Sequence, residues 1–341
     1  EFKTSLVRLQ KENIENLIID LRSNGGGLLN ESVKIVNFFI PKGQEVVSTK
    51  SRHKEMNRSY ISQAQPIASN LKLAVLIDEY SASASEIVAG SLQDLDKAVI
   101  VGNTSFGKGL VQQTKPVSFG GQIKLTVAKY YTPSGRCIQK LDYSSMQGSS
   151  KKIEDSLVKK FKTRNGREVT DSRAVEPDIK VEPEFFSPIT EKLILKDVIF
   201  DFVNQNIAFY DSSILTPSTF VLPDSAYSSF MKLAQTKNLN YETESNLRLQ
   251  DLKKIARKEK YIEENNEVFL LLDSIFKSNI NTDLIKNKSE IQFFIENEMI
   301  ARERFQKGRM EASIKKDPYV QTANKILNNQ LEYNEILGIT Q

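Results

Sequence analysis

The chain has 341 residues, 39% of them hydrophobic, and a formal net charge of +4. So small a charge does not point to nucleic acid or a membrane surface, and no apolar run reaches the roughly 18 residues of a membrane span. The single cysteine excludes an internal disulfide, and one cysteine with one histidine excludes a zinc site built on several such ligands. The length allows two domains, and a start at Glu1 rather than Met predicts a fragment of a longer protein.

The first half of the chain alternates patterns typical of strands and of helices. Apolar runs predict buried strands, segments with helical spacing lie between them, and glycine-containing turns predict two hairpins. The predicted strands are 17–21, 73–77 and 98–101; the helices are 30–39, capped by Asn30, and 85–95; the hairpins are 110–117 with 123–131, and a smaller one around Asn165 and Gly166; the polar stretch 142–152 is a predicted loop. This alternation predicts an α/β core, whose sheet has crossover helices and an added β-hairpin.

The composition changes near Pro183, after which the pattern is almost entirely helical. Apolar residues recur at helical spacing, and Glu, Lys and Asn fill the positions between them. The predicted helices include 224–236, 245–260, 265–278, 288–304 and 318–337. We therefore expect two domains, a catalytic core over 1–183 and a mostly α-helical C-terminal domain over 184–341, whose mixed charges mark the solvated faces of a helical bundle.

Two loops rich in glycine and serine carry the residues of greatest chemical interest. Residues 81–86 (SASASE) follow the predicted strand 73–77, and Lys108 lies in the segment 104–109 (TSFGKG). A hydroxyl alone is a poor nucleophile, but a lysine that burial holds in its neutral form can take the hydroxyl proton. The pairing predicts a hydrolase of the Ser/Lys type.

Other chemistries fit the sequence less well. A Ser-His-Asp triad would need His53, which lies in a polar stretch with no strand-turn-helix elbow beside it and is expected to be a solvated loop residue. A Cys-His protease would need Cys137, which follows a turn. The segment 102–108 approaches a phosphate-binding loop, but Gly109 stands where that loop needs Ser or Thr, and a strand rather than a helix is predicted next.

The order of several motifs over residues 14–182 closely resembles that of the carboxy-terminal processing (tail-specific) serine protease family. These motifs are 20–27 (DLRSNGGG), 81–87 (SASASEI), 92–94 (LQD), 101–109 (VGNTSFGKG) with Gln112, 130–136 (YYTPSGR) and 175–179 (VEPDI). Each motif alone is weak, whereas all of them in order are specific. The PDZ domain that family members carry ahead of this core is not part of these 341 residues, and the helical region after Pro183 is longer than the family core requires.

The resemblance assigns roles to individual residues. It implies that Ser83 is the nucleophile, that Lys108 is the general base and that Gln112 orients the lysine. It also implies an oxyanion hole made from backbone amides of the glycine loop, at Gly25 or Gly26, and of Ala84. The remaining serines of the motif, at 81 and 85, are expected to be capping or loop residues.

The local sequence is consistent with these roles. Ser83 lies between a strand end and a helix start, where the amides that follow point free N–H groups at a developing oxyanion. Glycines on both sides of Lys108 allow a tight turn that carries its amine inward, and on one strand Lys108 and Gln112 would share a face. Glu86 is expected chiefly as a first-turn acid favoured by the helix dipole, with support of the site as its second interpretation. Arg22 and Asp20 are expected to form a salt bridge that holds the glycine loop.

These features predict a serine endopeptidase that cleaves polypeptides near unfolded C-termini through a Ser/Lys dyad and an acyl-enzyme, and binds its substrate as an added strand. No metal or other cofactor, nucleotide or nucleic acid is expected. The alternative is a catalytically silent or autoinhibited module of the same fold that binds peptides by strand addition. A homo-oligomer formed through the helical tail is a further expectation. The resemblance implies a bacterial cell envelope or periplasm as the setting.

Overall fold

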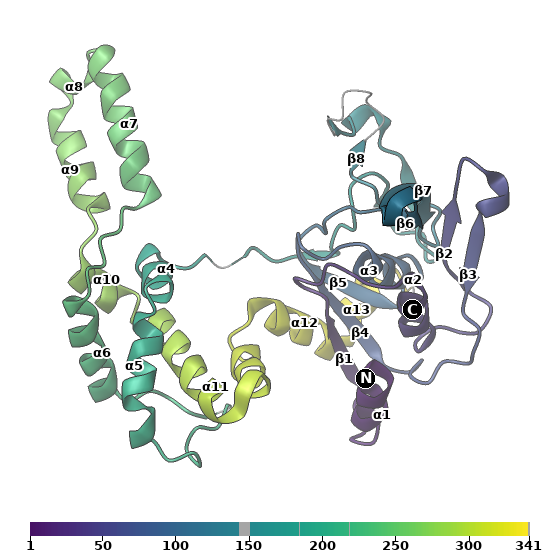
Figure 1. Cartoon of the computed structure of the whole chain (residues 1–341), viewed down its shortest axis with the longest axis horizontal. Helices are drawn as coiled ribbons and strands as arrows, with labels where there is room; N and C mark the ends of the chain where they lie inside the picture. The colour runs from purple at the N-terminus through teal and green to yellow at the C-terminus, as the bar shows by residue number, and fades with distance from the viewer. Residues whose placement is uncertain (143–150, 184, 218, 340–341) are drawn as a thin grey trace. The chain divides into compact units, whose positions relative to one another are not determined.

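The computed structural model describes residues 1–142, 151–183, 185–217 and 219–339 (Figure 1). It divides into two compact units. The core unit comprises Glu1–Glu182 together with Asp317–Gln341, and the helical unit comprises Pro183–Lys316. The change in composition near Pro183 therefore coincides with a real boundary. The predicted single helical domain over 184–341 differs from this division, because the last segment of the chain belongs to the core unit.

The core unit is built on a parallel sheet with the strand order β1-β4-β5-β12. The strands are β1 (Asn16–Asp20), β4 (Lys72–Ile77), β5 (Ala98–Gly102) and β12 (Ile179–Lys180). All residues of β5, and all of β4 after its first, are buried, as expected for central strands covered on both faces. The three predicted strands are confirmed, and the short β12 completes the sheet.

Helices cover both faces of this sheet. The predicted helices are α2 (Leu29–Asn37) and α3 (Ala84–Asp94); α2 begins after Leu28 in the N-cap position, so Asn30 lies inside its first turn and does not cap it. Alternate residues of β4 face opposite ways: Leu73 and Val75 join the cluster that contains α2 and α3, whereas Ala74 joins the cluster formed with the C-terminal helices. Those helices are α12 (Pro318–Asn328) and α13 (Gln330–Ile336).

A second, antiparallel sheet has the strand order β3-β2-β7-β6. Its strands are β2 (Glu45–Lys50), β3 (Arg58–Ile61), β6 (Leu110–Pro116) and β7 (Gln122–Tyr131). The predicted long hairpin is the β6–β7 pair, and the smaller predicted hairpin is β10 (Lys160–Lys162) with β11 (Glu168–Thr170). The predicted loop 142–152 is bounded by the short strands β8 (Leu141–Asp142) and β9 (Lys151–Lys152), and its residues 143–150 lie outside the described part of the chain. The core unit also contains the α-helix α1 (Phe2–Gln10).

Part of the helical unit, residues 189–241 and 280–299, forms an apolar core of its own, in which Phe202, Phe230 and Ile291 are buried. The helices of the helical unit are α4 (Pro188–Leu195), α5 (Val198–Asn206), α6 (Asp224–Thr236), α7 (Glu244–Lys258), α8 (Tyr261–Glu264), α9 (Asn266–Phe276), α10 (Ile280–Lys286) and α11 (Lys288–Ile314). The predicted helices of this region are confirmed, except that the segment 318–337 forms two helices, α12 and α13, and packs in the core unit. Within the described residues no helix is long and apolar enough to cross a membrane.

The packing of α12 on the sheet gives a first prediction. Leu327 is fully buried against β4 and β5, so we expect Leu327→Ala to lower the free energy of unfolding by about 2–5 kcal/mol, the cost of a buried leucine and its cavity. Leu331 is 67% exposed and serves as the matched control, for which Leu331→Ala should cost little. Urea denaturation followed by circular dichroism measures both. Equal effects of the two substitutions would show that α12 does not complete the core.

Candidate active site

Ser83 is the last residue of the connection between β4, which ends at Ile77, and α3, which begins at Ala84. It occupies the N-cap position of α3 with φ 58° and ψ −113°. Such a backbone conformation is costly for a residue with a side chain, and residues held in it cluster at active sites. Ala84 is the first residue of α3, a position whose N–H has no acceptor inside the helix. The predicted nucleophile is therefore half-buried in a strained turn at a helix N-terminus.

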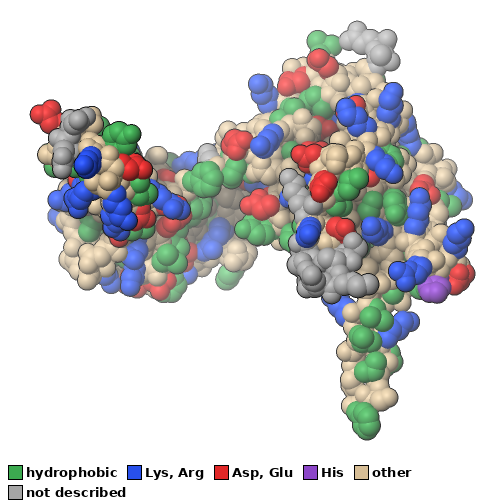
Figure 2. Space-filling view, turned by 90° about the horizontal axis from the view of Figure 1, so that it is seen from above, with side chains coloured by type: hydrophobic (Ala, Val, Ile, Leu, Met, Phe, Trp, Pro, Cys, Tyr) green, Lys and Arg blue, Asp and Glu red, His purple; other side chains and the backbone are tan. Residues whose placement is uncertain are grey.

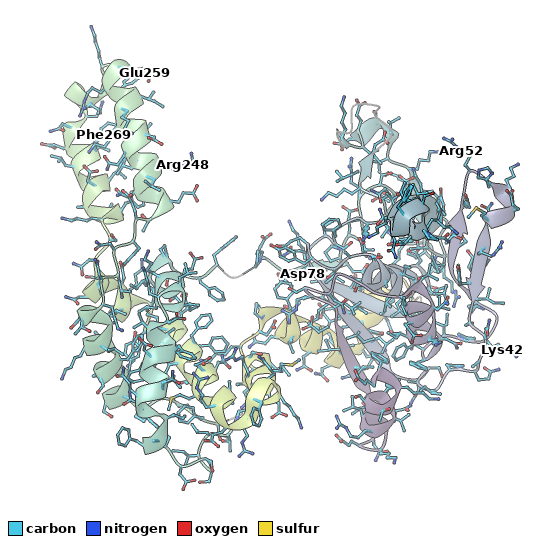
Figure 3. The ribbon with its side chains drawn as sticks, viewed as in Figure 1. Lys42, Arg52, Asp78, Arg248, Glu259 and Phe269 are labelled. Atoms are coloured by element: carbon cyan, nitrogen blue, oxygen red, sulfur yellow. The ribbon has the colours of Figure 1, made fainter. Side chains whose placement is uncertain are left out.

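The other two serines of the motif hold the loop in place. Ser81 Oγ donates to the carbonyl oxygen of Leu21 at 2.8 Å and accepts from the N–H of Asp78 at 2.9 Å. Asp78, labelled in Figure 3, directly follows β4. Ser85 Oγ donates to the carbonyl oxygen of Asn24 at 3.0 Å. Both serines are buried. Ser81 lies in the loop, as expected, whereas Ser85 is the second residue of α3 and contacts the loop through Asn24.

The buried carboxylate of Glu86 joins the serine loop to the lysine loop. Its Oε2 accepts from the backbone N–H of Ser83 at 2.8 Å and from that of Lys108 at 2.9 Å. Its Oε1 accepts from Ser105 Oγ at 2.6 Å and from the N–H of Gly107 at 2.7 Å. Burial raises the pKa of Glu86, and these four hydrogen bonds oppose that rise. Glu86 thus does more than complement a helix dipole, because it fixes the two loops to each other.

A buried tyrosine makes a second link between the two loops. The hydroxyl of Tyr130, in β7, lies 2.6 Å from the carbonyl oxygen of Lys108 and 3.1 Å from that of Ser83. Burial raises the pKa of Tyr130 well above its usual value, so the phenol keeps the proton that it donates. Tyr130 lies within one of the matched motifs, but its sequence context indicates no role for it. Its partners are 22 and 47 residues away in the chain, beyond the reach of any local pattern.

Lys108 itself is half-buried in a tightly packed turn. Gly107 has φ +89°, and a Cβ there would lie 2.4 Å from the Cβ of Lys140; a Cβ on Gly109 would lie 2.8 Å from the N of Gln139. The tight turn that these two glycines were expected to allow is present, and the inward direction of the lysine amine stays a prediction. The strand β6 begins only at Leu110, so Lys108 precedes it and the shared strand face expected for Lys108 and Gln112 is not formed.

Gln112 is exposed in β6, next to a bulge in the β6–β7 ladder. Among the described residues no hydrogen bond joins its side chain to Lys108. The implied role of Gln112, to orient the lysine, therefore stays a prediction. What the structure places around the lysine turn is instead a set of backbone contacts, made by Glu86 and Tyr130.

The glycine loop packs directly against the nucleophile turn. Gly26 has φ +95°, and a Cβ there would lie 2.5 Å from the carbonyl oxygen of Ala82 and 2.7 Å from the N of Ala84. Its own N–H donates to Asn24 Oδ1 at 2.9 Å. A Cβ on Gly25 would meet open space. The structure thus brings Gly26 and Ala84 together beside Ser83, and the assignment of Gly25 or Gly26 and Ala84 as oxyanion donors stays a prediction.

The salt bridge expected at the glycine loop is confirmed and extended. Arg22 Nη2 lies 2.6 Å from Asp20 Oδ2 and also 2.6 Å from Asp317 Oδ2. Asp317 caps α12, where its Oδ1 accepts from the N–H of Tyr319 at 2.9 Å. The returning C-terminal segment therefore reaches the base of the glycine loop, a contact between residues almost 300 positions apart.

The rival chemistries find no support in the geometry. His53 lies in the connection between β2 and β3, with its side chain 70% exposed and its Nδ1 3.5 Å from Glu55 (Figure 2). Burial raises the pKa of Cys137, which favours the thiol over the nucleophilic thiolate. A strand, not a helix, follows Lys108, so the phosphate-binding loop is not formed. No group of three or more His, Cys, Asp or Glu among the described side chains could hold a metal ion.

The contacts of Glu86 give a second prediction. In Glu86→Gln an amide nitrogen replaces one carboxylate oxygen, so two of the four donors lose their acceptor. We expect the free energy of unfolding to fall by about 2 kcal/mol, since a buried donor without a partner costs about 1–3 kcal/mol. Thermal and urea unfolding measure the loss, with the exposed Glu79→Gln as the matched control. If the Glu86→Gln protein is as stable as the control, the carboxylate does not hold the two loops together.

Together these features define the class of the core unit: an α/β unit that presents a strained serine at the start of the helix after a parallel strand, with a lysine turn fixed beside it. Comparison with known families agrees. Residues 1–145 match the family described as Peptidase family S41, and residues 189–327 match the one described as Probable PDZ-protease, C-terminal helical domain. The chain carries a peptidase family S41 domain followed by the helical domain of PDZ-proteases.

Individual relatives are similar over part of their length. A probable CtpA-like serine protease of Staphylococcus epidermidis (strain ATCC 12228) is 41% identical over 138 residues, which cover 40% of this chain and 28% of the relative. A protein of the same description from Staphylococcus aureus (strain COL) is 38% identical over 138 residues, with the same shares. The chain thus spans 28% of the length of these relatives. Among solved structures, a photosystem II D1 C-terminal processing protease is 28% identical with a TM-score of 0.41, over 53% of this chain and 38% of that one.

Proposed function

We propose that the core unit is the catalytic part of a serine endopeptidase that cleaves polypeptides near unfolded C-termini. The observation that carries the proposal is the double link between Ser83 and Lys108. One buried carboxylate oxygen accepts from the backbone N–H of both residues, and one buried hydroxyl lies within hydrogen-bond distance of both carbonyl oxygens. A nucleophile and its base need such a fixed separation, because proton transfer requires them to stay within reach of each other.

In the proposed reaction Ser83 Oγ attacks the carbonyl carbon of the scissile peptide bond while Lys108 Nζ, in its neutral form, takes the hydroxyl proton. The negative charge that develops on the carbonyl oxygen is stabilised by the N–H groups of Ala84 and of the glycine loop. Lys108 then returns the proton to the leaving amine as the C–N bond breaks. Water, activated by the same lysine, hydrolyses the acyl-enzyme and frees Ser83. Every protein group that takes part in this reaction belongs to the core unit.

We further propose that the substrate adds as a strand to the edge of the second sheet. The edges of that sheet are β3 and β6, and β6 begins two residues after Lys108. A peptide paired with β6 would therefore run directly into the turn that carries the lysine. Strand addition takes its affinity from backbone hydrogen bonds and so tolerates varied side chains, as an enzyme acting on unfolded segments requires.

A pair of N-methylated peptides tests the strand addition. In an extended peptide, alternate backbone N–H groups lie on the same edge. Methylation of alternate nitrogens therefore removes the hydrogen-bond donors on one edge of the peptide, and methylation of the nitrogens between them removes those on the other edge. We expect one of the two peptides to lose at least about tenfold in kcat/KM and the other to change little, because only one edge of an added strand pairs with the sheet. Equal turnover of both peptides would contradict binding as an added strand.

The rival function, a silent or autoinhibited module that binds peptides, makes a different prediction for the same chain. It would bind an extended peptide with no release of new N-termini, and substitution of Ser83 would leave its behaviour unchanged. Incubation with β-casein and mass spectrometry of the products separates the two functions. New termini close to the casein C-terminus are the expected result.

Two wider expectations also stand as proposals. The setting is a bacterial cell envelope or periplasm, which rests on the family resemblance and is tested by fractionation of the source cells with an antibody to the chain. A homo-oligomer formed through the helical unit is tested by light scattering. A molar mass near the 38.7 kDa of one chain would contradict it.

A further inference from the structure

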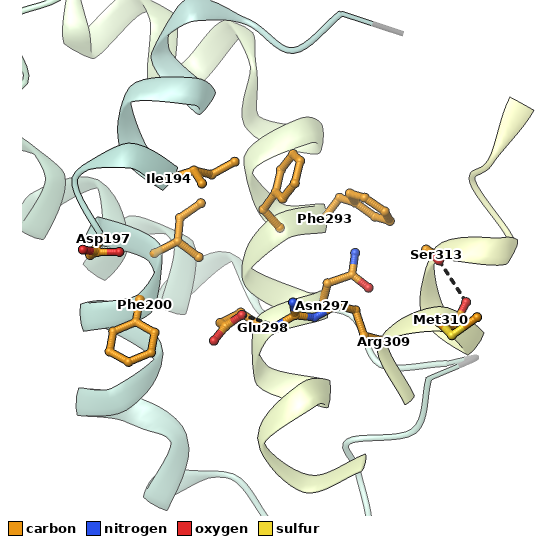
Figure 4. A pocket seen from close by; sticks show the side chains of 11 residues that line it. Ile194, Asp197, Phe200, Phe293, Asn297, Glu298, Arg309, Met310 and Ser313 are labelled. Atoms are coloured by element: carbon orange, nitrogen blue, oxygen red, sulfur yellow. Dashed lines mark hydrogen bonds and ion pairs between the residues drawn. The ribbon is translucent and has the colours of Figure 1, made fainter. Parts of the chain in front are cut away.

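The helical unit contains a cavity of about 540 Å³ between α4, α5 and the two parts of α11 (Figure 4). Most of its wall is apolar and is contributed by Ile194, Ile199, Phe200, Phe293, Phe294 and Met310. Its volume lies in the range of pockets that bind small molecules or single side chains. None of these residues belongs to the active site described above.

A strained corner in α11 forms one side of the cavity. The helix breaks at Phe305, whose φ of 55° and ψ of −157° are adopted almost only by glycine. At Gly308 the chain passes so close to the preceding part that a Cβ would lie 2.1 Å from the Cβ of Arg304. An ion pair of 2.5 Å between Arg309 and Glu298 joins the two parts across the corner. Strain of this kind persists only where the surroundings fix it, and it concentrates at ligand sites.

Two buried polar atoms at this corner lack partners. The side chain of Asn297 is directed into the cavity (Figure 4), although only 7% of the residue is exposed. Its Oδ1 has no hydrogen-bond partner among the described residues, and neither has Nε of Arg309, which lines the same cavity. One atom is an acceptor and the other is a donor. A buried polar group without a partner is costly, so an occupant that supplied the complementary groups would be favoured.

We infer that this cavity binds one aromatic or branched aliphatic residue of an unfolded polypeptide. The side chain packs against the phenylalanines, the peptide N–H donates to Asn297 Oδ1, and the peptide C=O accepts from Arg309 Nε. A peptide group is the common unit that offers one donor and one acceptor beside an apolar side chain. The half-exposed rim at Ile194, Phe200 and Met310 gives the occupant its way in. A role in holding substrates for Ser83 rests on the proposed function, whereas the binding itself does not.

Three small probes separate the parts of this recognition. N-acetyl-phenylalanine N-methylamide carries the ring and both amides, N-acetyl-glycine N-methylamide carries only the amides, and toluene carries only the ring. Binding is measured by NMR titration of the full chain with Ser83→Ala, so that cleavage plays no part. We expect the phenylalanine probe to bind at least about tenfold more tightly than either of the others. Toluene binding as tightly as the phenylalanine probe would overturn the proposal, since the polar atoms would then contribute nothing.

A substitution at the polar atom tests the contact directly. Asn297→Leu keeps the size of the side chain but removes the acceptor, so the phenylalanine probe should bind at least about tenfold more weakly while toluene binding is retained. Because the variant removes a buried polar atom that lacks a partner, we expect its Tm to be unchanged or higher. Asn238→Leu, at an exposed position outside the cavity, is the matched control.

A second variant keeps the proposal falsifiable if Asn297→Leu does not fold. Met310 is 66% exposed at the rim, so Met310→Trp should fold and should close the cavity to the phenylalanine probe. Unchanged binding of this probe to either folded variant would overturn the site. The two proposals can fail independently of each other. If the phenylalanine probe does not bind, β-casein cleavage by the unsubstituted chain is unaffected. If the chain does not cleave casein, binding of the probe is unaffected.

Discussion

Ser83→Ala abolishes β-casein cleavage and leaves the fold intact. The hydroxyl is the proposed nucleophile, and loss of a nucleophilic serine lowers kcat by about 10³-fold or more, because the remaining groups cannot form an acyl-enzyme. The residue is half-buried in a loop whose hydrogen bonds are made by its backbone and by neighbouring side chains. We therefore expect the circular dichroism spectrum and the Tm to match those of the parent. Product release from β-casein, followed by gel and mass spectrometry, measures the activity.

Ser85→Ala is the matched control, because it removes a hydroxyl from the same motif. That hydroxyl is buried and bonded to the carbonyl oxygen of Asn24, so its loss should lower the Tm and leave most of the activity. The two variants are therefore expected to have opposite effects: Ser83→Ala loses activity and keeps its stability, whereas Ser85→Ala keeps most of its activity and loses stability. Casein cleavage by Ser83→Ala at the parent rate would show that another residue is the nucleophile.

Lys108→Arg is as inactive as Lys108→Ala. Arginine keeps the positive charge and the length of the side chain, but a guanidinium does not lose its proton in proteins and so cannot act as a base. Removal of a general base that also activates the nucleophile costs roughly 10³-fold or more in kcat/KM. Initial rates of casein cleavage measure the loss. Lys124→Arg, at an exposed position in β7, is the control and should retain the parent rate.

The comparison of the arginine and alanine variants separates two roles of Lys108. A lysine that only attracts the substrate, or only shapes the turn, would be replaced in part by arginine and not by alanine. Substantial turnover by Lys108→Arg would therefore reject the lysine as base. It would leave the contacts of Glu86 and Tyr130 with that turn as structural features.

The sequence predicted the parts of the site that depend on short segments. The strand β4, the turn at Ser83 and the start of α3 follow one another within about a dozen residues, and the local pattern of apolar run, small residues and helical spacing indicated all three. The turn at Lys108 could also be predicted, because the glycines on both sides of the lysine are typical of a tight turn. These predictions concern conformations that a few neighbouring residues determine.

What the sequence could not predict are contacts between distant segments. The role of Tyr130 depends on where β7 lies against the turns at Ser83 and Lys108, and no periodicity encodes that position. For Gln112, alternation along a strand predicts a face shared with Lys108, but the strand starts at Leu110, after the lysine. For α12, helical spacing predicted an apolar face but not which surface would cover it, so its packing against β4 and β5 was missed.

The return of the last segment to the core unit has a consequence for the order of events during synthesis. A ribosome releases Glu1–Glu182, with the loops of Ser83 and Lys108, before it makes Asp317 and the helices that follow. At about 5–20 residues per second, the helical unit between them delays this last segment by roughly 7 to 27 seconds. During that time one face of β4 and β5 lacks its cover, and Arg22 lacks its second carboxylate. The helical unit is an uninterrupted stretch of chain and can fold first. A partly made chain therefore lacks a complete core unit until its C-terminal helices emerge.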